Sequence, residues 1–142
     1  MAIEDNSYVG SDTWRFFKNK IKDYCIDDNY RNILVILTDG YIFHKNSKIE
    51  EDNKTSYLYI YKLQFIITIE KENFGFIPAT ENLQNLEILV LGINPDNKNS
   101  YEQDVIEKYW SDWFNSMKVN KYESKNASLP SNMDKIIKDF IL

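Results

Sequence analysis

A short apolar run followed by Asp-Gly constrains the fold of this chain more than any other feature. The run from Ile33 to Thr38 is rich in β-branched residues, Asp39-Gly40 follows it, and a second apolar run extends from Tyr41 to His44. Asp-Gly between two such runs predicts a β-hairpin, because a type I′ turn needs positive φ angles at both central residues. The first run is apolar on both faces, which predicts a central strand covered on both sides.

Three further stretches have strand patterns. Residues 56–70 predict a strand over about 40 Å long, which we expect to be bent near Lys62. One face of this strand carries an apolar or aromatic side chain at every second position: Tyr57, Tyr59, Tyr61, Leu63, Phe65, Ile67 and Ile69. Phe74–Ile77 and Leu86–Ile93 are shorter strands, each followed by a proline-containing turn. Residues 46–55 are highly charged and predict an exposed loop.

Helical periodicity marks both ends of the chain. Residues 13–26 predict a first helix capped by Asp12. Ser100 and Gln103 match a capping box, and a continuous apolar stripe extends from there to Met117. Residues 118–129 are polar and predict a linker. Pro130 then opens a last helix with a second apolar stripe.

These elements predict the fold class. The order is one helix, five strands and two helices, with no internal repeat. Consecutive strands joined by short turns favour antiparallel pairing. We therefore expect one α+β domain over residues 1–142, in which residues 1–11 could be flexible. Its core would be a mainly antiparallel sheet of about five strands, with the N-terminal helix and both C-terminal helices packed on it.

The charge balance narrows the partners that the chain is expected to have. The 142 residues carry a formal net charge of -5, and the 17 lysines and arginines form no basic stripe. Nucleic-acid binding is therefore not expected, because phosphate backbones would be repelled. The N-terminus lacks a signal-peptide pattern, and no apolar run reaches about 18 residues. We expect a cytoplasmic protein that does not bind membranes, and the bias toward Asn, Lys, Ile and Tyr suggests a bacterial or viral genome.

The sequence contains no recognisable catalytic, metal-binding or cofactor-binding motif. Cys25 lies on the apolar face of the first helix and His44 ends the expected hairpin, and no pattern places them together. Zinc would need more cysteine and histidine ligands than these two residues provide. The four glycines are scattered and form no phosphate-binding loop. We expect no enzyme activity, no cofactor and no metal, although a carboxylate pair or cluster brought together by folding stays open.

Aromatic side chains are abundant and allow two interpretations. Tyr57, Tyr59 and Tyr61 resemble a stacking platform, and Trp110, Trp113 and Phe114 resemble a recognition patch. Aromatic residues at strict strand or helix spacing more often pack a helix onto a sheet. We therefore expect core packing for both groups.

Elimination favours an acidic module that binds a basic protein. The specific hypothesis is an inhibitor of a toxin or nuclease-like enzyme, such as an immunity protein or antitoxin, that covers the basic surface of its target. The residues expected to contact the partner are acidic and lie on the charged loop or the polar face of the long helix: Glu50, Glu51, Asp52, Glu102, Asp104, Glu107 and Asp112.

Two alternatives come from other classes of protein. The first is a self-assembling structural or phage-type accessory protein that forms a homo-oligomer through the long strand or through Phe140 and Ile141 of the last helix. The second is a small enzyme or ligand-binding domain with a pocket between the sheet and the helix that carries Trp110 and Trp113.

Overall fold

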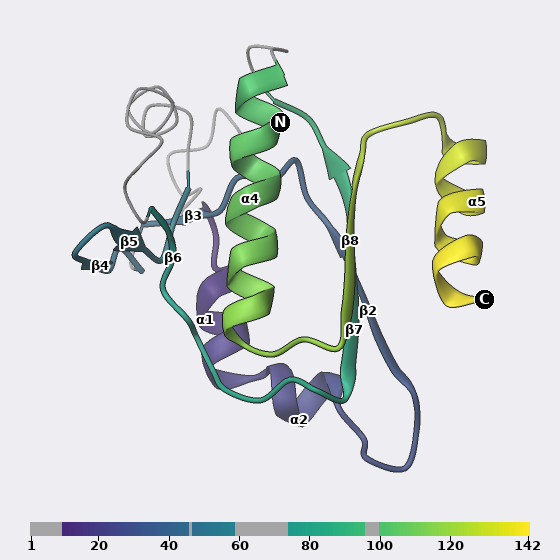
Figure 1. Ribbon diagram of the computed structural model, residues 1–142, viewed down its shortest axis with the longest axis horizontal. Helices are drawn as coiled ribbons and strands as arrows, with labels where there is room; N and C mark the ends of the chain where they lie inside the picture. Colours follow the sequence, from purple (N-terminus) through teal and green to yellow (C-terminus); the bar gives the residue numbers. More distant parts are fainter. Residues whose placement is uncertain (1–9, 46, 59–73, 96–99) are drawn as a thin grey trace.

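The computed structural model describes residues 10–45, 47–58, 74–95 and 100–142 (Figure 1). Helices and strands both contribute to this part of the chain. In chain order they are β1 (Gly10–Ser11), α1 (Thr13–Asn19), α2 (Ile21–Cys25), β2 (Asn32–Leu37), β3 (Phe43–His44), β4 (Glu50–Glu51), β5 (Lys54–Thr55), β6 (Gly75–Phe76), β7 (Leu86–Ile93), α4 (Ser100–Ser116), β8 (Lys121–Asn126) and α5 (Pro130–Ile141).

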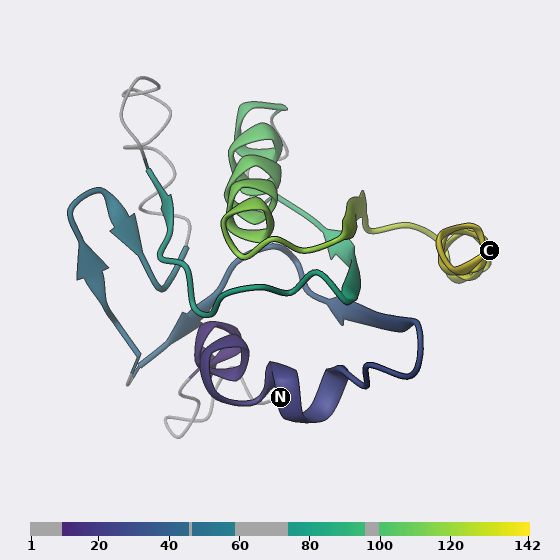
Figure 2. The same ribbon diagram turned by 60° about the horizontal axis from the view of Figure 1, so that its bottom comes forward.

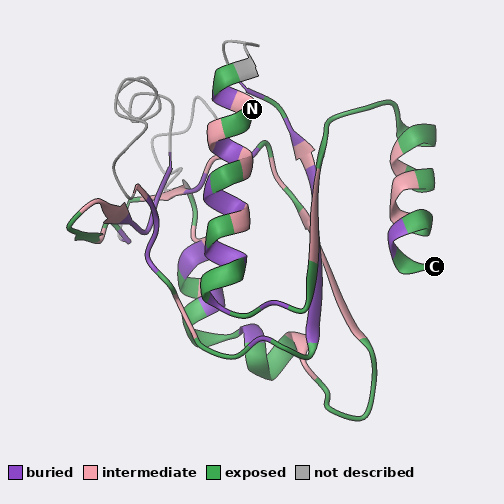
Figure 3. Cartoon of the chain, viewed as in Figure 1, coloured by how far each residue is buried: buried purple, intermediate pink, exposed green. Residues whose placement is uncertain are grey.

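The main sheet is parallel and has the order β2-β7-β8. Its register places Ile33 beside Glu87 and Glu87 beside Lys121. Helix α4 connects β7 to β8, as a parallel pair requires, because the chain must return to the starting edge before the next strand begins. The central strand β7 is buried at nearly every position, which is typical of a strand covered on both faces (Figure 3).

Helices cover both faces of this sheet. Figure 2 shows α1, α2 and α4 on one face and α5 on the other. Because strand side chains alternate, Ile88 and Val90 belong to the main core, whereas Leu89 and Leu91 lie on the opposite face of β7, the strand that α5 contacts. All four residues are at most 1 % exposed. The second face therefore has its own small apolar layer.

Buried aromatic rings join α1 and α4 to the sheet. The Phe17 and Trp113 ring centroids are 4.6 Å apart, and Trp113 stacks on Phe114. The indole nitrogens of Trp14 and Trp113 both donate to the Ile77 carbonyl, at 2.7 and 3.0 Å. Core packing of the α4 aromatic residues is thus confirmed. Tyr57 is also buried, whereas Tyr59 and Tyr61 lie outside the described residues.

The remaining described strands form two small sheets. Strands β1 and β3 pair antiparallel, and the order β4-β5-β6 combines an antiparallel and a parallel pair. The expected loop at 46–55 is therefore partly wrong. It contains the β4–β5 hairpin, which turns at Asp52 with a φ of 55°, and Ser47 and Thr55 are buried.

The expected five-stranded antiparallel sheet is wrong. The stretch predicted as a polar linker contains β8, which tolerates charged side chains because it lies at an edge of the sheet. The described strands form sheets of two or three strands, and the largest is parallel. Sequence proximity suggested hairpins, but β2 pairs with a strand that begins about fifty residues later.

The expected Asp-Gly hairpin is also wrong. Strand β2 pairs with β7, whereas β3 pairs with β1. Gly40 has a φ of 109°, but Asp39 is not among the described residues with positive φ, so no type I′ turn forms. Gly40 instead lies against α4, where a Cβ atom would be 2.5 Å from Ile106 Cγ2 and where the Gly40 carbonyl accepts the Trp110 indole hydrogen at 2.9 Å.

Other predicted elements can be compared directly with the structure. The helix predicted at 13–26 is interrupted at Lys20, but its cap is confirmed, since Arg15 N donates to Asp12 Oδ1 at 3.3 Å. The strand at Leu86–Ile93 and the two C-terminal helices are confirmed. The long strand at 56–70 and the flexibility at 1–11 fall mostly outside the described residues.

Candidate functional site

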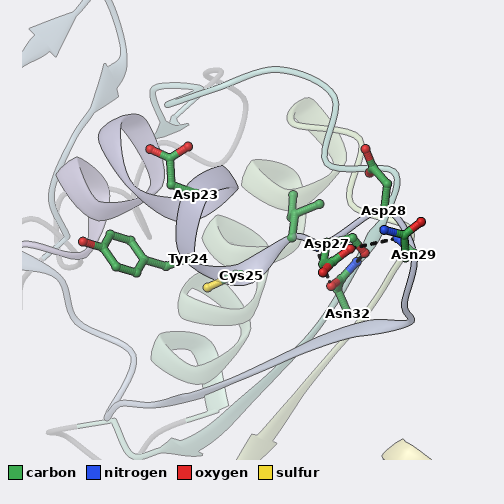
Figure 4. A pocket seen from close by; sticks show the side chains of 8 residues that line it. Asp23, Tyr24, Cys25, Asp27, Asp28, Asn29 and Asn32 are labelled. Carbon is green, nitrogen blue, oxygen red and sulfur yellow. Dashed lines mark hydrogen bonds between the residues drawn. The ribbon is translucent and has the colours of Figure 1, made fainter.

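The end of α2 and the segment that joins it to β2 form an acidic surface. We call Asp23–Tyr30 the acidic loop, because its eight residues include three aspartates and two tyrosines but no basic residue. Together with Asn32 it borders an open hollow of about 580 Å³ (Figure 4). Asp23 and Tyr24 extend from α2, and Asp28 and Asn29 lie on the turn beyond it. The loop lies at the end of the molecule away from β4 (Figures 1 and 2).

The side chain of Asn32 holds this loop in one conformation. Its Oδ1 accepts a hydrogen bond from Asp27 N at 2.9 Å. Its Nδ2 is within 3.0 to 3.1 Å of three carbonyl oxygens, those of Asp27, Tyr30 and Asn85. Asn32 is the first residue of β2, so the sheet anchors the loop. Hydrogen bonds therefore tie the turn from Asp27 to Tyr30 to the start of β2 and to the segment before β7.

Two of the three aspartates have defined side-chain positions. Asp27 Oδ1 accepts a hydrogen bond from Asn29 N at 3.0 Å, which forms a tight Asx turn. Asp28 Oδ1 accepts from Asn85 Nδ2 at 2.7 Å, across the gap to the segment before β7. Asp23, Asp27 and Asp28 nevertheless remain exposed. The negative charges are therefore presented to solvent from a fixed backbone.

Two tyrosines accompany these charges. Tyr24 is 75 % exposed and Tyr30 is 73 % exposed. Tyrosine is enriched at the energetically important positions of protein interfaces, because its ring buries area while its hydroxyl retains a hydrogen bond. The loop therefore combines aromatic groups with carboxylates on a rigid support.

The basic residue that follows the loop does not offset its charge. The Arg31 guanidinium donates from Nε to Glu87 Oε2 at 2.7 Å and from Nη2 to Glu87 Oε1 at 3.0 Å. Its Nη1 donates to the Ile141 carbonyl in the last turn of α5. The hydrogen bond from Arg31, followed by the nearby positive charges of Arg31 and Lys121, lowers the pKa of Glu87. Arg31 is thus committed to the sheet and α5.

Cys25 and His44 are placed apart. Cys25 lines the hollow beside the acidic loop, where burial raises the pKa of its thiol and so disfavours the nucleophilic thiolate. His44 lies on β3, with its Nδ1 3.7 Å from Asp12 Oδ2. Ser47 Oγ donates to that same Asp12 oxygen at 2.8 Å, rather than to the imidazole, so these three residues lack the serine–histidine contact of a nucleophilic triad.

The described residues contain neither a cluster of metal-ligating side chains nor a helix that could span a membrane. In the part of the chain that the structure describes, no three histidine, cysteine, aspartate or glutamate side chains gather closely enough to hold a metal ion. Of the helices in these same ranges, none has the length and apolar character needed to cross a bilayer.

The acidic residues predicted to contact a partner fall into two separate groups. Glu50, Glu51 and Asp52 are exposed on the β4–β5 hairpin. On α4, Asp104 and Asp112 are exposed, and the half-buried Glu107 accepts a hydrogen bond from Gln103 at 3.2 Å.

Glu102 departs from the expected exposed position, because it is 1 % exposed. It lies four residues before Ile106 and eight before Trp110, on the inner face of α4. This spacing is the signal in the sequence from which the buried position of Glu102 could have been predicted.

The acidic loop was missed as a site at the level of sequence. In the sequence, Asp27-Asp28-Asn29 indicates the end of the first helix, and Asp27 and Asp28 are one of the carboxylate pairs that stay open as a metal site. The available signal was the combination of three aspartates and two tyrosines without a basic residue. The side-chain amide of Asn32, which makes the loop rigid, had no recognisable motif.

Comparisons of this chain with models of known protein families, with curated proteins and with solved structures gave no match.

Proposed function

We propose that this protein binds a basic protein partner and inhibits it by covering its surface, as an immunity protein or antitoxin does. The observation that carries the proposal is the acidic loop, in which exposed tyrosines and carboxylates lie on the end of α2 and on a turn that Asn32 ties to β2. The net charge of -5 favours encounter with a cationic partner and opposes most nucleic acids.

Rigidity of the loop supports binding for a thermodynamic reason. Association loses free energy when loops and side chains become ordered at the interface. In this protein, hydrogen bonds with Asn32, Asn29 and Asn85 position the backbone of Asp27 and the carboxylates of Asp27 and Asp28. More of the interaction free energy therefore remains available for affinity.

The acidic residues predicted from the sequence have a smaller role in this proposal than the acidic loop. Glu51, Asp52, Asp104 and Asp112 are exposed, but the acidic loop carries two exposed tyrosines, Tyr24 and Tyr30, whereas α4 carries one, Tyr101. We propose that these other carboxylates contribute long-range attraction, whereas the acidic loop forms the contact. Glu102 is left out of the contact because it is buried.

The test is a quantitative pull-down from the native host's lysate with the tagged full chain, at low and moderate salt. The double variant Asp23→Lys/Tyr24→Ser removes one carboxylate and one exposed ring from the loop. We expect recovery of a stoichiometric basic protein by the unmodified chain. The double variant should recover at least tenfold less, since one interface tyrosine contributes roughly 2 kcal/mol.

The control variant is Asp104→Lys/Tyr101→Ser. It makes the same two changes on α4, where Tyr101 is 65 % exposed and Asp104 is also exposed. It should leave recovery within about threefold of the unmodified chain, which corresponds to roughly 0.6 kcal/mol. Equal losses in both variants would show that only total charge matters. Recovery of no basic protein by the unmodified chain would contradict the proposed function itself.

A further inference from the structure

Among the strands that the structure describes, β2 and β8 are the edges of the main sheet, and they differ in chemical character. β8 carries Lys121, Glu123 and Lys125, and such charges protect an edge from pairing with another chain. β2 at the other edge has the sequence Asn-Ile-Leu-Val-Ile-Leu, with no charge and no proline, and its register with β7 is continuous. β2 therefore has the composition of a central strand but lies at an edge. The prediction that this strand lies at the centre of the sheet is wrong.

The outer backbone groups of β2 are unpaired within the described residues. Thr38 N donates to Leu91 O on β7 at 3.1 Å. Backbone groups alternate in direction along a strand, so Ile33, Val35 and Leu37 direct their N–H and C=O groups away from β7. No described strand pairs with this side of β2. Such a row of free donors and acceptors can pair with an added strand.

Apolar side chains are accessible on both faces of the sheet beside this edge. A hollow of about 320 Å³ lies between β2 and α1, where Phe16, Leu34 and Ile36 contribute apolar lining. On the opposite face Leu37 is 74 % exposed, and Ile33 and Val35 are only half-buried. An added strand would place alternate side chains in the hollow and on this second apolar face.

We propose that the outer edge of β2 binds an extended strand of the basic partner, which continues the parallel sheet of this protein. Basic residues that flank this strand would contact Asp27 and Asp28 at one end of β2 and Asp39 at the other. This inference rests on the proposed function, because it specifies how the same partner is held. Main-chain hydrogen bonds would supply affinity, and the flanking charges would supply selectivity.

Charge favours a basic partner over a second copy of the chain. Asp27 and Asp28 precede β2 and Asp39 follows it, and all three are exposed. In an antiparallel pair of two β2 strands, the acidic end of each copy would face an acidic end of the other. Each copy also carries a net charge of -5. The like charges at both ends oppose the pairing of two copies. Lysines or arginines at the ends of a partner strand would instead be attracted to these carboxylates and favour pairing with that strand.

The test uses a defined peptide rather than the unidentified partner. The probe has six alternating valines and threonines with two lysines at each end. It is titrated into the full chain labelled with nitrogen-15, and backbone amide signals are followed by NMR. We expect the signals of Ile33, Val35 and Leu37 to shift, with a Kd on the order of 100 µM for so short a strand.

Two methylated peptides distinguish strand pairing from charge attraction. In one peptide the backbone nitrogens of the valines are methylated, and in the other those of the threonines. A strand pairs with β2 through one of its edges only, so one methylated peptide should bind at least tenfold more weakly than the parent. The other should bind within about threefold of it. Equal binding by all three peptides would overturn the inference.

Val35→Pro supplies an independent test on the protein. Proline is tolerated where an edge-strand N–H points to solvent, and it removes that donor. Binding of the parent peptide should fall at least tenfold. The control Val35→Thr keeps the N–H and should bind nearly as the unmodified chain does. Thermal unfolding of both variants shows whether the fold is retained, and the methylated peptides remain decisive if Val35→Pro unfolds.

The remaining outcomes separate this inference from the proposed function. Shifts confined to the acidic loop, or none at β2 up to about 1 mM peptide, would overturn the strand-pairing inference and leave the proposed function standing. Equal binding of a peptide with glutamates in place of the lysines would contradict the acidic binding surface as well. A dimer of this chain that Val35→Pro dissociates would assign the β2 edge to a second copy and overturn the partner-strand inference.

Discussion

Gly92 adopts a backbone conformation that residues with a side chain rarely adopt. Its φ is 111°, and a Cβ atom there would lie 2.9 Å from the carbonyl oxygen of Thr38 at the end of β2. The register between β7 and β8 is also interrupted between Leu91 and Ile93. A glycine at such an irregularity allows two backbones to approach closely. Because the contact is with backbone, movement of a side chain cannot relieve it.

Gly92→Ala should lower the free energy of unfolding by about 1 to 3 kcal/mol, through strain at positive φ and the contact with Thr38. Urea unfolding followed by tryptophan fluorescence measures this change. Gly75→Ala is the control, because a Cβ atom there meets nothing within 4 Å. It should change stability by less than about 1 kcal/mol. Equal effects of the two substitutions would show that the Thr38 contact is not the cause.

Helix α5 is attached to the sheet mainly by its last turn. Phe140 is 2 % exposed, and Lys121 Nζ lies 4.4 Å from its ring centroid. Lys121 also donates to the Phe140 carbonyl at 3.4 Å, and Arg31 donates to that of Ile141. These cations satisfy terminal carbonyl groups and complement the negative end of the helix dipole. The first turn has no side-chain cap, so the anchor is at the C-terminal end.

Phe140→Ala should therefore release α5 while the rest of the sheet stays folded. Removing a buried phenylalanine side chain destabilises the packing by roughly 3 to 5 kcal/mol. The other apolar residues of the helix, Met133, Ile136 and Ile137, are only half-buried, so we expect that their contacts do not compensate for this loss. Hydrogen exchange should show faster amide exchange in 130–141 and unchanged protection in β7. The control is Leu142→Ala, since Leu142 is 99 % exposed and its removal should have no effect. Simultaneous loss of protection in β7 would show that α5 and the sheet unfold together.

At the scale of the whole molecule, Glu87 links three parts: strand β7, Arg31 at the end of the acidic loop, and the last turn of α5. It lies on β7, holds Arg31 next to the acidic loop, and through Arg31 is linked to the end of α5. The hydrogen bond from Arg31 is the main cause of its lowered pKa. A carboxyl group whose folded pKa is below the unfolded value of 4.5 stabilises the fold above that pH. This stabilisation disappears as the pH falls through the folded value.

Glu87→Gln should consequently reduce the loss of stability in acid. Between pH 7 and pH 3 the unmodified chain should lose more free energy of unfolding than the variant does, by about 1 kcal/mol or less. The difference is small because the Arg31 side chain is 49 % exposed, so solvent screens the pair. Glu51→Gln, which removes an exposed carboxylate on β4, is the matched control. An equal acid response in the Glu87 variant and the unmodified chain would contradict the prediction.

Local sequence patterns determined the elements whose stability depends on near neighbours in the chain. The apolar stripe from Val105 to Met117 defined α4, and Pro130 marked the start of α5. The apolar run at 86–93 defined β7 with its correct bounds. The same periodicity correctly predicted that Trp110 and Trp113 would be buried. Each of these features follows from spacings of two to four residues, which the sequence displays directly.

Only the tertiary structure decided which strands pair, in which direction, and what remains exposed. The backbone pattern of β2 suits a hairpin with β3 or a parallel pair with β7, and the structure has the parallel pair, with α4 packed against Gly40. The rigid acidic loop likewise depends on Asn32 and Asn85, which are 53 positions apart. Contacts between such distant residues leave no local periodicity. For that reason the edge position of β2 and the acidic loop emerged from the fold, whereas the helices and the aromatic core could be predicted from the sequence.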